Sequence, residues 1–162
     1  MGANVVFIAT YDTKGLESDY IKKRVIANGA LCTTIDVGVG GEPTARPDVP
    51  LSKLCEGTEF TVESIHRMPR GQAVAAASNL VERYVDQIVT QTMRTLPLGL
   101  PKLMLSTLAS GNTRWYLEDS DIAIMPSIAD VAGLNCVTMM IFDRFAALAA
   151  KAAQWYSSDF GA

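Results

Sequence analysis

One stretch of this 162-residue chain constrains its fold more than any other, residues 102–113, with the sequence Lys-Leu-Met-Leu-Ser-Thr-Leu-Ala-Ser-Gly-Asn-Thr. Pro97 and Pro101 precede it, and the apolar run at 103–105 is too short for a helix. A run of this kind is typical of a strand buried on both faces of a parallel sheet. Small polar residues follow it at once. Open α/β sheets bind their ligands at the carboxyl ends of their strands, so this loop is the first candidate for a binding site.

The loop after this strand contains Ser110, Gly111, Asn112 and Thr113. Backbone N–H groups and hydroxyls in such a loop can approach an anion without crowding from large side chains. We therefore predict that these four residues contact a phosphate or a base. An ordinary polar connection between a strand and a helix has the same composition, so the loop alone leaves both interpretations open.

Composition and charge exclude several classes of function. The chain is long enough for one domain with a sizeable core, and 49% of its residues are apolar. Its net charge is −3 and it has no basic block, which argues against nucleic acid as a partner. No apolar run is long enough to span a membrane and no signal peptide is evident, so we expect a cytoplasmic protein. The three widely spaced cysteines, Cys32, Cys55 and Cys136, predict buried free thiols and no metal site.

Hydrophobic periodicity predicts an alternation of strands and helices that begins as a doubly wound fold. The predicted strands are at 4–9, 31–37, 103–105 and 121–125, and the predicted helices are at 16–28, 51–55, 61–66, 71–85, 86–96 and 137–156. Gly29 is the expected stop signal of the first helix. The last helix is apolar on nearly every side, which predicts packing against the sheet and against a partner subunit or a further domain.

Five motifs stand in an order that points to a known family. They are Ile8-Ala-Thr-Tyr-Asp-Thr-Lys-Gly15, Ile35-Asp-Val-Gly-Val39, Leu96-Pro-Leu-Gly-Leu-Pro-Lys102, Ser106-Thr-Leu-Ala-Ser-Gly-Asn-Thr113 and Asp130-Val-Ala-Gly-Leu-Asn135. The chain resembles the Tm-1-like ATP-binding domain family (UPF0261), in its N-terminal domain, almost from end to end. The resemblance implies a single Rossmann-like three-layer α/β domain over 1–162, with a mainly parallel sheet flanked by helices, that binds ATP. Longer members of the family carry a second, C-terminal domain, which the 162 residues do not include, and we expect that Ala162 is not the natural end of the protein.

The sequence departs from the family's pattern near 85–86. Family members have a strand and a glycine-rich loop of the form Gly-Gly-Ser-Gly-Gly-Thr at this point, whereas here the helix at 71–85 runs directly into the segment at 86–96. Deleting a central strand would strip hydrogen bonds from both neighbouring strands. We therefore expect the natural protein to hold these residues, in a loop that is mobile without ligand. A real deletion would weaken the case for ATP binding.

The first motif supplies the candidate residues Thr10, Asp12, Thr13 and Lys14, directly after the first strand. Lys14 could pair with phosphates, and Asp12 could hold Mg²⁺ or a ribose hydroxyl. The alternative is that Asp12 caps the following helix and Lys14 is solvated.

The second motif supplies Asp36, Gly38, Gly40 and Gly41. A carboxylate at a strand end can bind a ribose, but Asp36 could equally brace the glycine turn that follows it. The glycines permit close approach of the backbone to a ligand, although glycines are common in turns for other reasons.

The last motif contains Asp130, Gly133 and Asn135, where a turn stabilised by Asn135 competes with ligand contact. His66, the only histidine, lies far along the chain from every motif, and we expect it at the surface.

The function that these residues predict is a nucleotide-binding domain that acts as a regulatory or assembly module, with ATP and possible Mg²⁺ as ligands. No Ser-His-Asp set, His/Cys cluster or Walker lysine motif is present in the sequence. One alternative is a magnesium-dependent slow ATPase, or a phosphoryl- or acyl-activating enzyme, that uses Asp12 and Lys14. Another is an interaction protein with a structural nucleotide. The expected partners are a second copy, bound through helical surfaces as a homodimer, and a C-terminal domain or partner protein.

Overall fold

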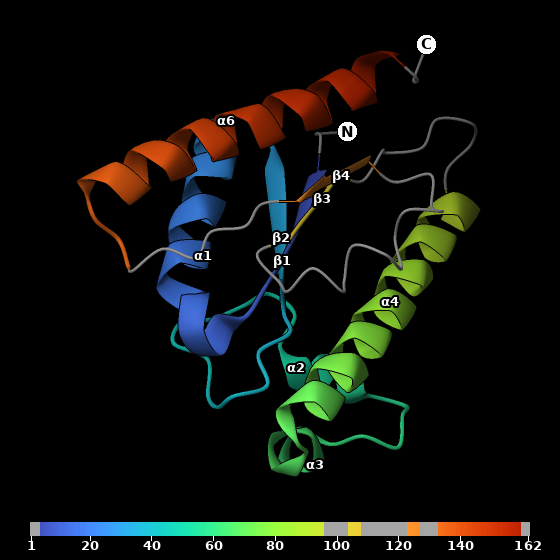
Figure 1. Cartoon of the computed structure of the whole chain (residues 1–162). Coiled ribbons are helices and arrows are strands. Elements are labelled where there is room, and N and C mark those ends of the chain that lie inside the picture. The colour runs from blue at the N-terminus through green and yellow to red at the C-terminus, as the bar shows by residue number, and fades with distance from the viewer. Residues whose placement is uncertain (1–3, 96–103, 108–122, 127–132, 160–162) are drawn as a thin grey trace.

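The computed structural model describes residues 4–95, 104–107, 123–126 and 133–159 (Figure 1). Its strands and helices are β1 (Asn4–Ala9), α1 (Tyr11–Ala27), β2 (Leu31–Asp36), α2 (Leu51–Cys55), α3 (Val62–Arg67), α4 (Arg70–Thr95), β3 (Met104–Thr107), β4 (Ala123–Pro126) and α6 (Cys136–Asp159). The predicted α/β class is confirmed. Gly29 follows α1 with a φ of 84°, a backbone conformation that glycine adopts readily, and the helix ends where the sequence predicts.

The four described strands form one parallel sheet in the order β2-β1-β3-β4. β1 lies beside β2 with Val5 opposite Cys32, and beside β3 with Val5 opposite Met104. After Asn4, every residue of β1 is buried, because helices cover both faces of the sheet at this central strand. Parallel neighbours need a crossover between them, and α1 provides it from β1 to β2.

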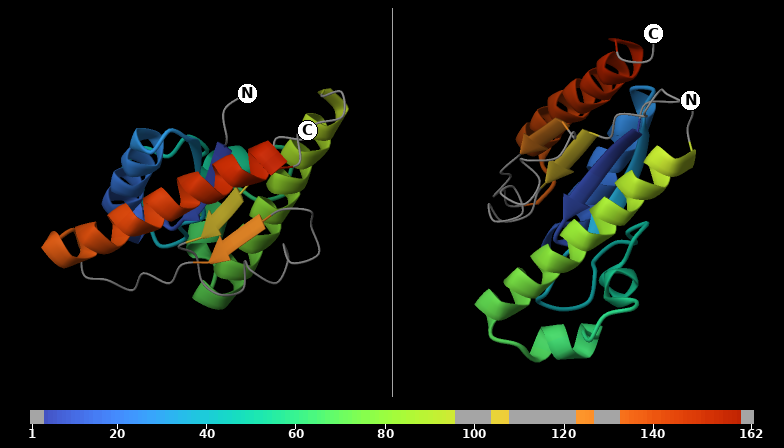
Figure 2. Two further views of the ribbon diagram at one scale, coloured as in Figure 1. Left: turned by 90° about the horizontal axis from the view of Figure 1, so that it is seen from above. Right: turned by 90° about the vertical axis from the view of Figure 1, so that its right-hand side faces the viewer.

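Helices lie on both faces of the sheet (Figure 2), and each face carries a separate core. Val5 and Phe7 of β1 pack with α1 and α6, whereas Val6 and Ile8 pack with α2, α3 and α4. The side of α6 that faces the sheet is built from small residues, Ala146, Ala149, Ala150 and Ala153, all of them buried. Such small side chains let α6 approach α1 and the sheet closely.

The prediction of two successive helices at 71–85 and 86–96 is wrong. Residues Arg70–Thr95 form the single helix α4 of 26 residues. The physical reason is that neither glycine nor proline interrupts the chain at 85–86, so the helical hydrogen bonds continue through this point.

The proline-rich segment at 43–50 is irregular, as predicted, but its end joins the sheet. Val49 is buried and forms a parallel bridge with Ile35 of β2. The carboxylate of Asp48 accepts hydrogen bonds from the backbone N–H and the hydroxyl of Thr34, both at 2.8 Å. The segment is therefore anchored along the outer edge of β2.

The three cysteines are free, as predicted, but they are not all buried. Cys55 is buried and Cys32 is partly buried. Burial raises the pKa of the Cys32 thiol to about 12. Cys136 is exposed, because it is the first residue of α6 and lies outside the face that packs on the sheet.

Candidate functional site

A cavity of about 390 Å³ lies at the carboxyl ends of β1 and β2. The turn between β1 and α1 and the loop after β2 form one side of it, and α3 and the first turns of α4 form the other. Its lining residues are Thr10, Asp12, Thr13, Val37, Val39, Gly40, His66, Met68, Arg70, Ala73, Val74, Ala77 and Ser78. The cavity thus brings together four of the predicted site residues, Thr10, Asp12, Thr13 and Gly40, with residues of α3 and α4 that were not among the predicted site residues.

Asp12 links the two loops that form the first side of the cavity. Its Oδ1 accepts a hydrogen bond from the backbone N–H of Thr13 at 2.8 Å, and its Oδ2 accepts one from the backbone N–H of Gly40 at 2.7 Å. The first bond lies within the opening turn of α1, of which Asp12 is the second residue, so Asp12 is not the N-cap of the helix. Each oxygen keeps a lone pair with which to bind a hydroxyl or a cation.

The hydroxyls of Thr10 and Thr13 lie 3.2 Å apart at the start of α1, within hydrogen-bond distance of each other. Both residues line the cavity. Thr10 is the residue before α1, but its side chain makes no capping hydrogen bond to the helix. Its hydroxyl and that of Thr13 therefore form a small polar patch on the cavity wall.

Asp36 is not among the residues that line the cavity. Its Oδ1 accepts hydrogen bonds from the backbone N–H of Tyr11 at 3.0 Å and from that of Gly38 at 2.7 Å. This is the bracing role that the sequence left open beside ribose binding. Burial raises the pKa of the Asp36 carboxyl, while the hydrogen bonds from Gly38 and Tyr11 work in the opposite direction.

The glycines after β2 fit closely around these carboxylates. A Cβ on Gly40 would lie 2.7 Å from Oδ2 of Asp12, and one on Gly38 would lie 2.8 Å from Oδ1 of Asp12. Gly41 has no atom within 4 Å of its Cβ position and does not line the cavity. A side chain at 38 or 40 would therefore displace the Asp12 carboxylate, so contacts within the protein favour glycine at both positions without a ligand.

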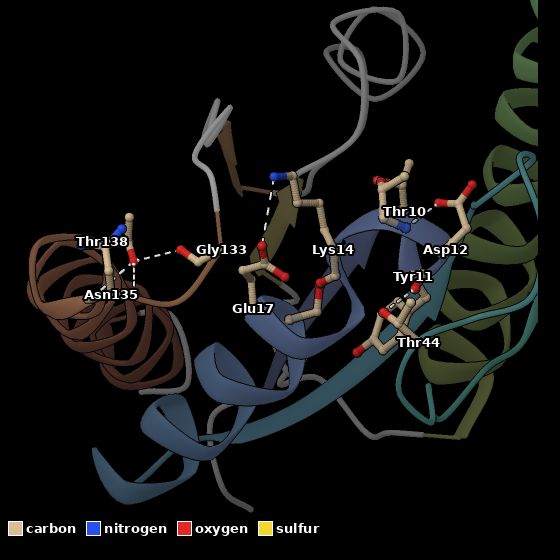
Figure 3. Close-up of polar contacts among 11 residues, drawn as sticks. Thr10, Tyr11, Asp12, Lys14, Glu17, Thr44, Gly133, Asn135 and Thr138 are labelled. Atoms are coloured by element: carbon tan, nitrogen blue, oxygen red, sulfur yellow. Dashed lines mark hydrogen bonds and ion pairs between the residues drawn. The ribbon is translucent and has the colours of Figure 1, made fainter.

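Lys14 lies at a kink in α1 and forms an ion pair with buried Glu17, with 3.8 Å between Nζ and Oε1 (Figure 3). It does not line the cavity. At the kink, the carbonyl of Tyr11 accepts hydrogen bonds from the backbone N–H and hydroxyl of Thr44, which come from the proline-rich segment. Asp12 and Lys14 belong to the same sequence motif, but Asp12 lines the cavity whereas Lys14 pairs with Glu17 outside it.

His66 is partly exposed and lines the cavity, together with Met68 and Arg70, although it lies far along the chain from the motifs that form the other side. A helix that connects parallel strands runs antiparallel to them, so its first turn lies near their carboxyl ends. That rule applied to α4 would have placed 66–70 at this edge of the sheet, and it is the signal that the sequence analysis missed.

The described residues of the last motif, 133–135, lie directly before α6. Oδ1 of Asn135 accepts hydrogen bonds from the backbone N–H groups of Val137 and Thr138, each at 3.0 Å. The hydroxyl of Thr138 accepts the N–H of Asn135 at 2.8 Å and donates to the carbonyl of Gly133. This arrangement is a helix cap, the turn-stabilising role that the sequence analysis weighed against ligand contact.

The predicted contacts Ser110, Gly111, Asn112 and Thr113 lie outside the described residues, as does Asp130. β3 ends at Thr107, which lies beside Ile8 of β1. The assignment of this loop to a phosphate or base stays a prediction.

The fold and the site together define an α/β protein with a parallel sheet and a cavity of mixed polar and apolar lining at the carboxyl ends of two of its strands. Within this class, the chain belongs to the UPF0261 family. The model of the "Uncharacterised protein family (UPF0261) N-terminal domain" matches it in two segments, residues 3–92 and 86–158.

Three relatives show how far the similarity extends. A UPF0261 protein of Mesorhizobium japonicum is 34% identical over 169 residues, which cover 93% of this chain and 42% of the relative. A UPF0261 protein of Rhizobium meliloti is 36% identical over 168 residues, or 88% of this chain and 40% of the relative. The ToMV susceptible protein tm-1(GCR26) of Solanum lycopersicum is 28% identical over 103 residues, or 50% of this chain and 14% of the relative. The chain therefore spans about two fifths of the length of the bacterial relatives.

Two further observations concern the described residues alone. They contain no group of three or more His, Cys, Asp or Glu side chains placed to hold a metal ion. None of the helices within them has the length and hydropathy needed to span a membrane.

Proposed function

We propose that this chain is a nucleotide-binding domain that acts as a regulatory or assembly module, with ATP as its ligand. The observation that carries the proposal is the cavity at the carboxyl ends of β1 and β2, which the first two sequence motifs help to line. Its volume of about 390 Å³ lies in the usual range of small-molecule sites.

The chemistry of the cavity suits a nucleotide. Apolar side chains of Val37, Val39 and Val74 can pack against a base, and the carboxylate of Asp12 can accept a ribose hydroxyl. A Rossmann-like arrangement is part of the proposal. In the order β2-β1-β3-β4, the strand order reverses between β1 and β3, and nucleotides bind at the carboxyl ends of the strands at such a point. Thr10, Asp12 and Thr13 follow β1 and line the cavity, so one side of the cavity adjoins this point.

The assembly role is supported by the surface of α6. One face of this helix is buried in the protein's own core, but the opposite face exposes large apolar side chains, with Leu148 61% and Met140 55% exposed. Val137, Ile141 and Trp155 are exposed on the same helix. Large apolar side chains gathered on an exposed helix are typical of a protein–protein contact, and we propose that a second copy of the chain covers them in a homodimer.

An enzymatic role is the second candidate, because Asp12 lies in the cavity with lone pairs that could hold Mg²⁺. Slow ATP hydrolysis, or activation of a phosphoryl or acyl group, would need a charged partner for the phosphates. Single-turnover hydrolysis that disappears in Asp12→Ala, while ATP binding persists, would favour this role.

The test of the proposal is calorimetric titration of the purified chain, after its intact mass is confirmed, with ATP in the presence and absence of Mg²⁺. A steric variant shows whether the cavity is the site. Val74→Trp places a large side chain into the cavity from α4, whereas Ala75→Trp adds the same side chain at an exposed neighbouring position that does not line it.

We expect stoichiometric ATP binding that Val74→Trp abolishes and Ala75→Trp leaves intact. Circular dichroism checks that both variants remain folded. Binding that survives in Val74→Trp would place the nucleotide elsewhere. No binding by the unmodified chain would refute the nucleotide module and leave the interaction protein as the better account.

A further inference from the structure

The charged side chains around the cavity lie on two opposite walls. Asp12 lies on the wall formed by α1, with the buried carboxylate of Asp36 close behind it at the start of the same helix. His66 and Arg70 lie on the opposite wall, which α3 and α4 form. A ligand in this cavity therefore meets negative charge on one side, and a permanent positive charge with a basic imidazole on the other.

The start of α1 is an unfavourable place for a phosphate, although helix N-termini commonly bind anions. Its first N–H, that of Tyr11, already donates to the carboxylate of Asp36, and the N–H of Thr13 donates to Asp12. Two carboxylates occupy the position that an anionic ligand would take, and they would repel its charge. Lys14, the cation nearest in sequence, pairs with Glu17 and does not line the cavity.

The opposite wall, formed by α3 and α4, has the positive charge and the hydrogen-bond donors that a phosphate requires. Arg70 is the first residue of α4, a helix of 26 residues whose opening N–H groups carry a partial positive charge. A guanidinium can bind two phosphate oxygens at once through parallel hydrogen bonds. His66 is held in the same wall by α3, partly buried, and can donate a further hydrogen bond.

We propose that the cavity binds the phosphate groups of its nucleotide against His66 and Arg70, with the ribose toward Asp12. This orientation rests on the proposed nucleotide-binding function and adds to it the residues that recognise the phosphates. It makes the affinity depend on the number of phosphate groups, and it assigns that dependence to the α3–α4 wall and not to the lysine of the first motif.

The test uses calorimetric titration of the 162-residue chain with adenosine, AMP, ATP and inorganic tripolyphosphate. The variants are Arg70→Gln and His66→Gln, which remove basic groups from the wall. Arg67→Gln is the matched control, because Arg67 is an exposed residue of α3 that does not line the cavity. Lys14→Gln tests the alternative phosphate partner.

We expect Arg70→Gln and His66→Gln each to weaken ATP and tripolyphosphate binding by about 10-fold or more, the usual effect of losing a charged hydrogen bond. Adenosine binding should change by less than about twofold in the same variants, and Arg67→Gln should resemble the unmodified chain for every ligand.

Three results would overturn the orientation: an equal loss of adenosine and ATP binding in Arg70→Gln, an equal loss of ATP binding in Arg67→Gln, or a phosphate-dependent loss confined to Lys14→Gln. Tripolyphosphate separates this inference from the proposed function. If tripolyphosphate binds in an Arg70-dependent manner while adenosine and ATP do not bind, the assignment of phosphate binding to His66 and Arg70 is supported and the nucleotide function is refuted. If no probe binds, both are refuted.

Discussion

The carboxylate of Asp36, the last residue of β2, accepts the backbone N–H of Tyr11, the first residue of α1, at 3.0 Å. Both residues are buried, and they lie 25 positions apart in the chain. The same oxygen accepts the N–H of Gly38. The start of α1 is therefore capped by a side chain of the neighbouring strand and not by Thr10, the residue before the helix.

Removing this buried acceptor should destabilise the protein. In Asp36→Ala, two backbone N–H groups lose their partner, and we expect a loss of about 2–3 kcal/mol in the free energy of unfolding. Asp36→Asn keeps an oxygen at the same place and removes the buried charge, so its cost should be below about 1 kcal/mol. Urea unfolding of both variants measures the difference, and equal costs would show that charge and not hydrogen bonding is what matters.

The same residue should give the stability a defined pH dependence. Burial raises the pKa of Asp36 in the folded protein, although the N–H groups of Gly38 and Tyr11 oppose this. The folded state therefore binds a proton more tightly than the unfolded chain, and the contribution of Asp36 to stability falls as pH rises through the window between the two pKa values. Above this window, the contribution is constant.

We expect the free energy of unfolding, taken relative to Asp36→Asn, to fall as pH rises above the ordinary Asp value of about 3.9 and to level off toward neutral pH. Urea unfolding at several pH values between about 4 and 7 measures it. Parallel curves for the two proteins would contradict the expectation.

Gly15 should be intolerant of alanine although it lies in a helix. A Cβ at Gly15 would lie 2.7 Å from the backbone N of Ala45 and 2.5 Å from Oγ1 of Thr44. The loop would have to move, and we expect Gly15→Ala to cost about 2–3 kcal/mol in thermal or urea unfolding.

Gly71, in the first turn of α4, is the matched control because nothing lies within 4 Å of its Cβ position. Alanine is the better helix former, so Gly71→Ala should stabilise the protein by about 0.5 kcal/mol. The same sign for both substitutions would show that the contact of the loop with α1 is unimportant.

Asp48 should stabilise the protein at neutral pH and lose this effect in acid. Partial burial raises the pKa of Asp48, but hydrogen bonds from Lys22 and Thr34 outweigh this effect and hold the pKa below its ordinary value. A lowered pKa in the folded state means that the contribution is complete above the unfolded pKa and is lost as pH falls through the folded one.

Asp48→Ala should therefore cost about 1–2 kcal/mol at pH 7, and the difference from the unmodified chain should shrink below about pH 4. Asp19→Ala is the control, since Asp19 forms an exposed ion pair with Lys23 on one face of α1, and its cost should be within about 0.5 kcal/mol. If the loss in the free energy of unfolding caused by Asp48→Ala is the same at every pH, the charge of Asp48 is not the source of its stabilising effect.

The exposed face of α6 should control assembly. If a second copy covers this face, Leu148→Lys places a charge in the contact, and light scattering should show a shift from dimer to monomer. Leu16→Lys is the control, because Leu16 is equally exposed but lies on α1. Both variants should remain folded, because each substitution is at an exposed position. An unmodified chain that is monomeric at every concentration tested would refute the homodimer.

Local sequence patterns predicted the elements of this fold, and the reasons are physical. A short apolar run without polar residues, such as the one in β1, can be satisfied only by burial on both faces, which a parallel sheet with helices on each side provides. Gly29 ends α1 because glycine adopts positive φ without strain. These properties depend on residues close together in the chain, so the sequence was sufficient to infer them.

The single helix α4 shows the limit of this approach. Residues 71–85 and 86–96 were predicted as two successive helices, although no glycine or proline separates them. The helical propensity of the chain continues through 85–86, and it was the better guide.

The residues of the site were predicted only in part, for a related reason. By itself, the sequence determined the strands, the order of the helices and the polar turn at Thr10, Asp12 and Thr13, because each depends on neighbouring residues. Only the tertiary structure brought His66 and Arg70 to the same cavity and turned Asp36 inward to cap α1. Such convergence depends on how crossover helices pack against the sheet, and on which buried N–H groups need an acceptor, and neither is encoded in any short stretch of the chain.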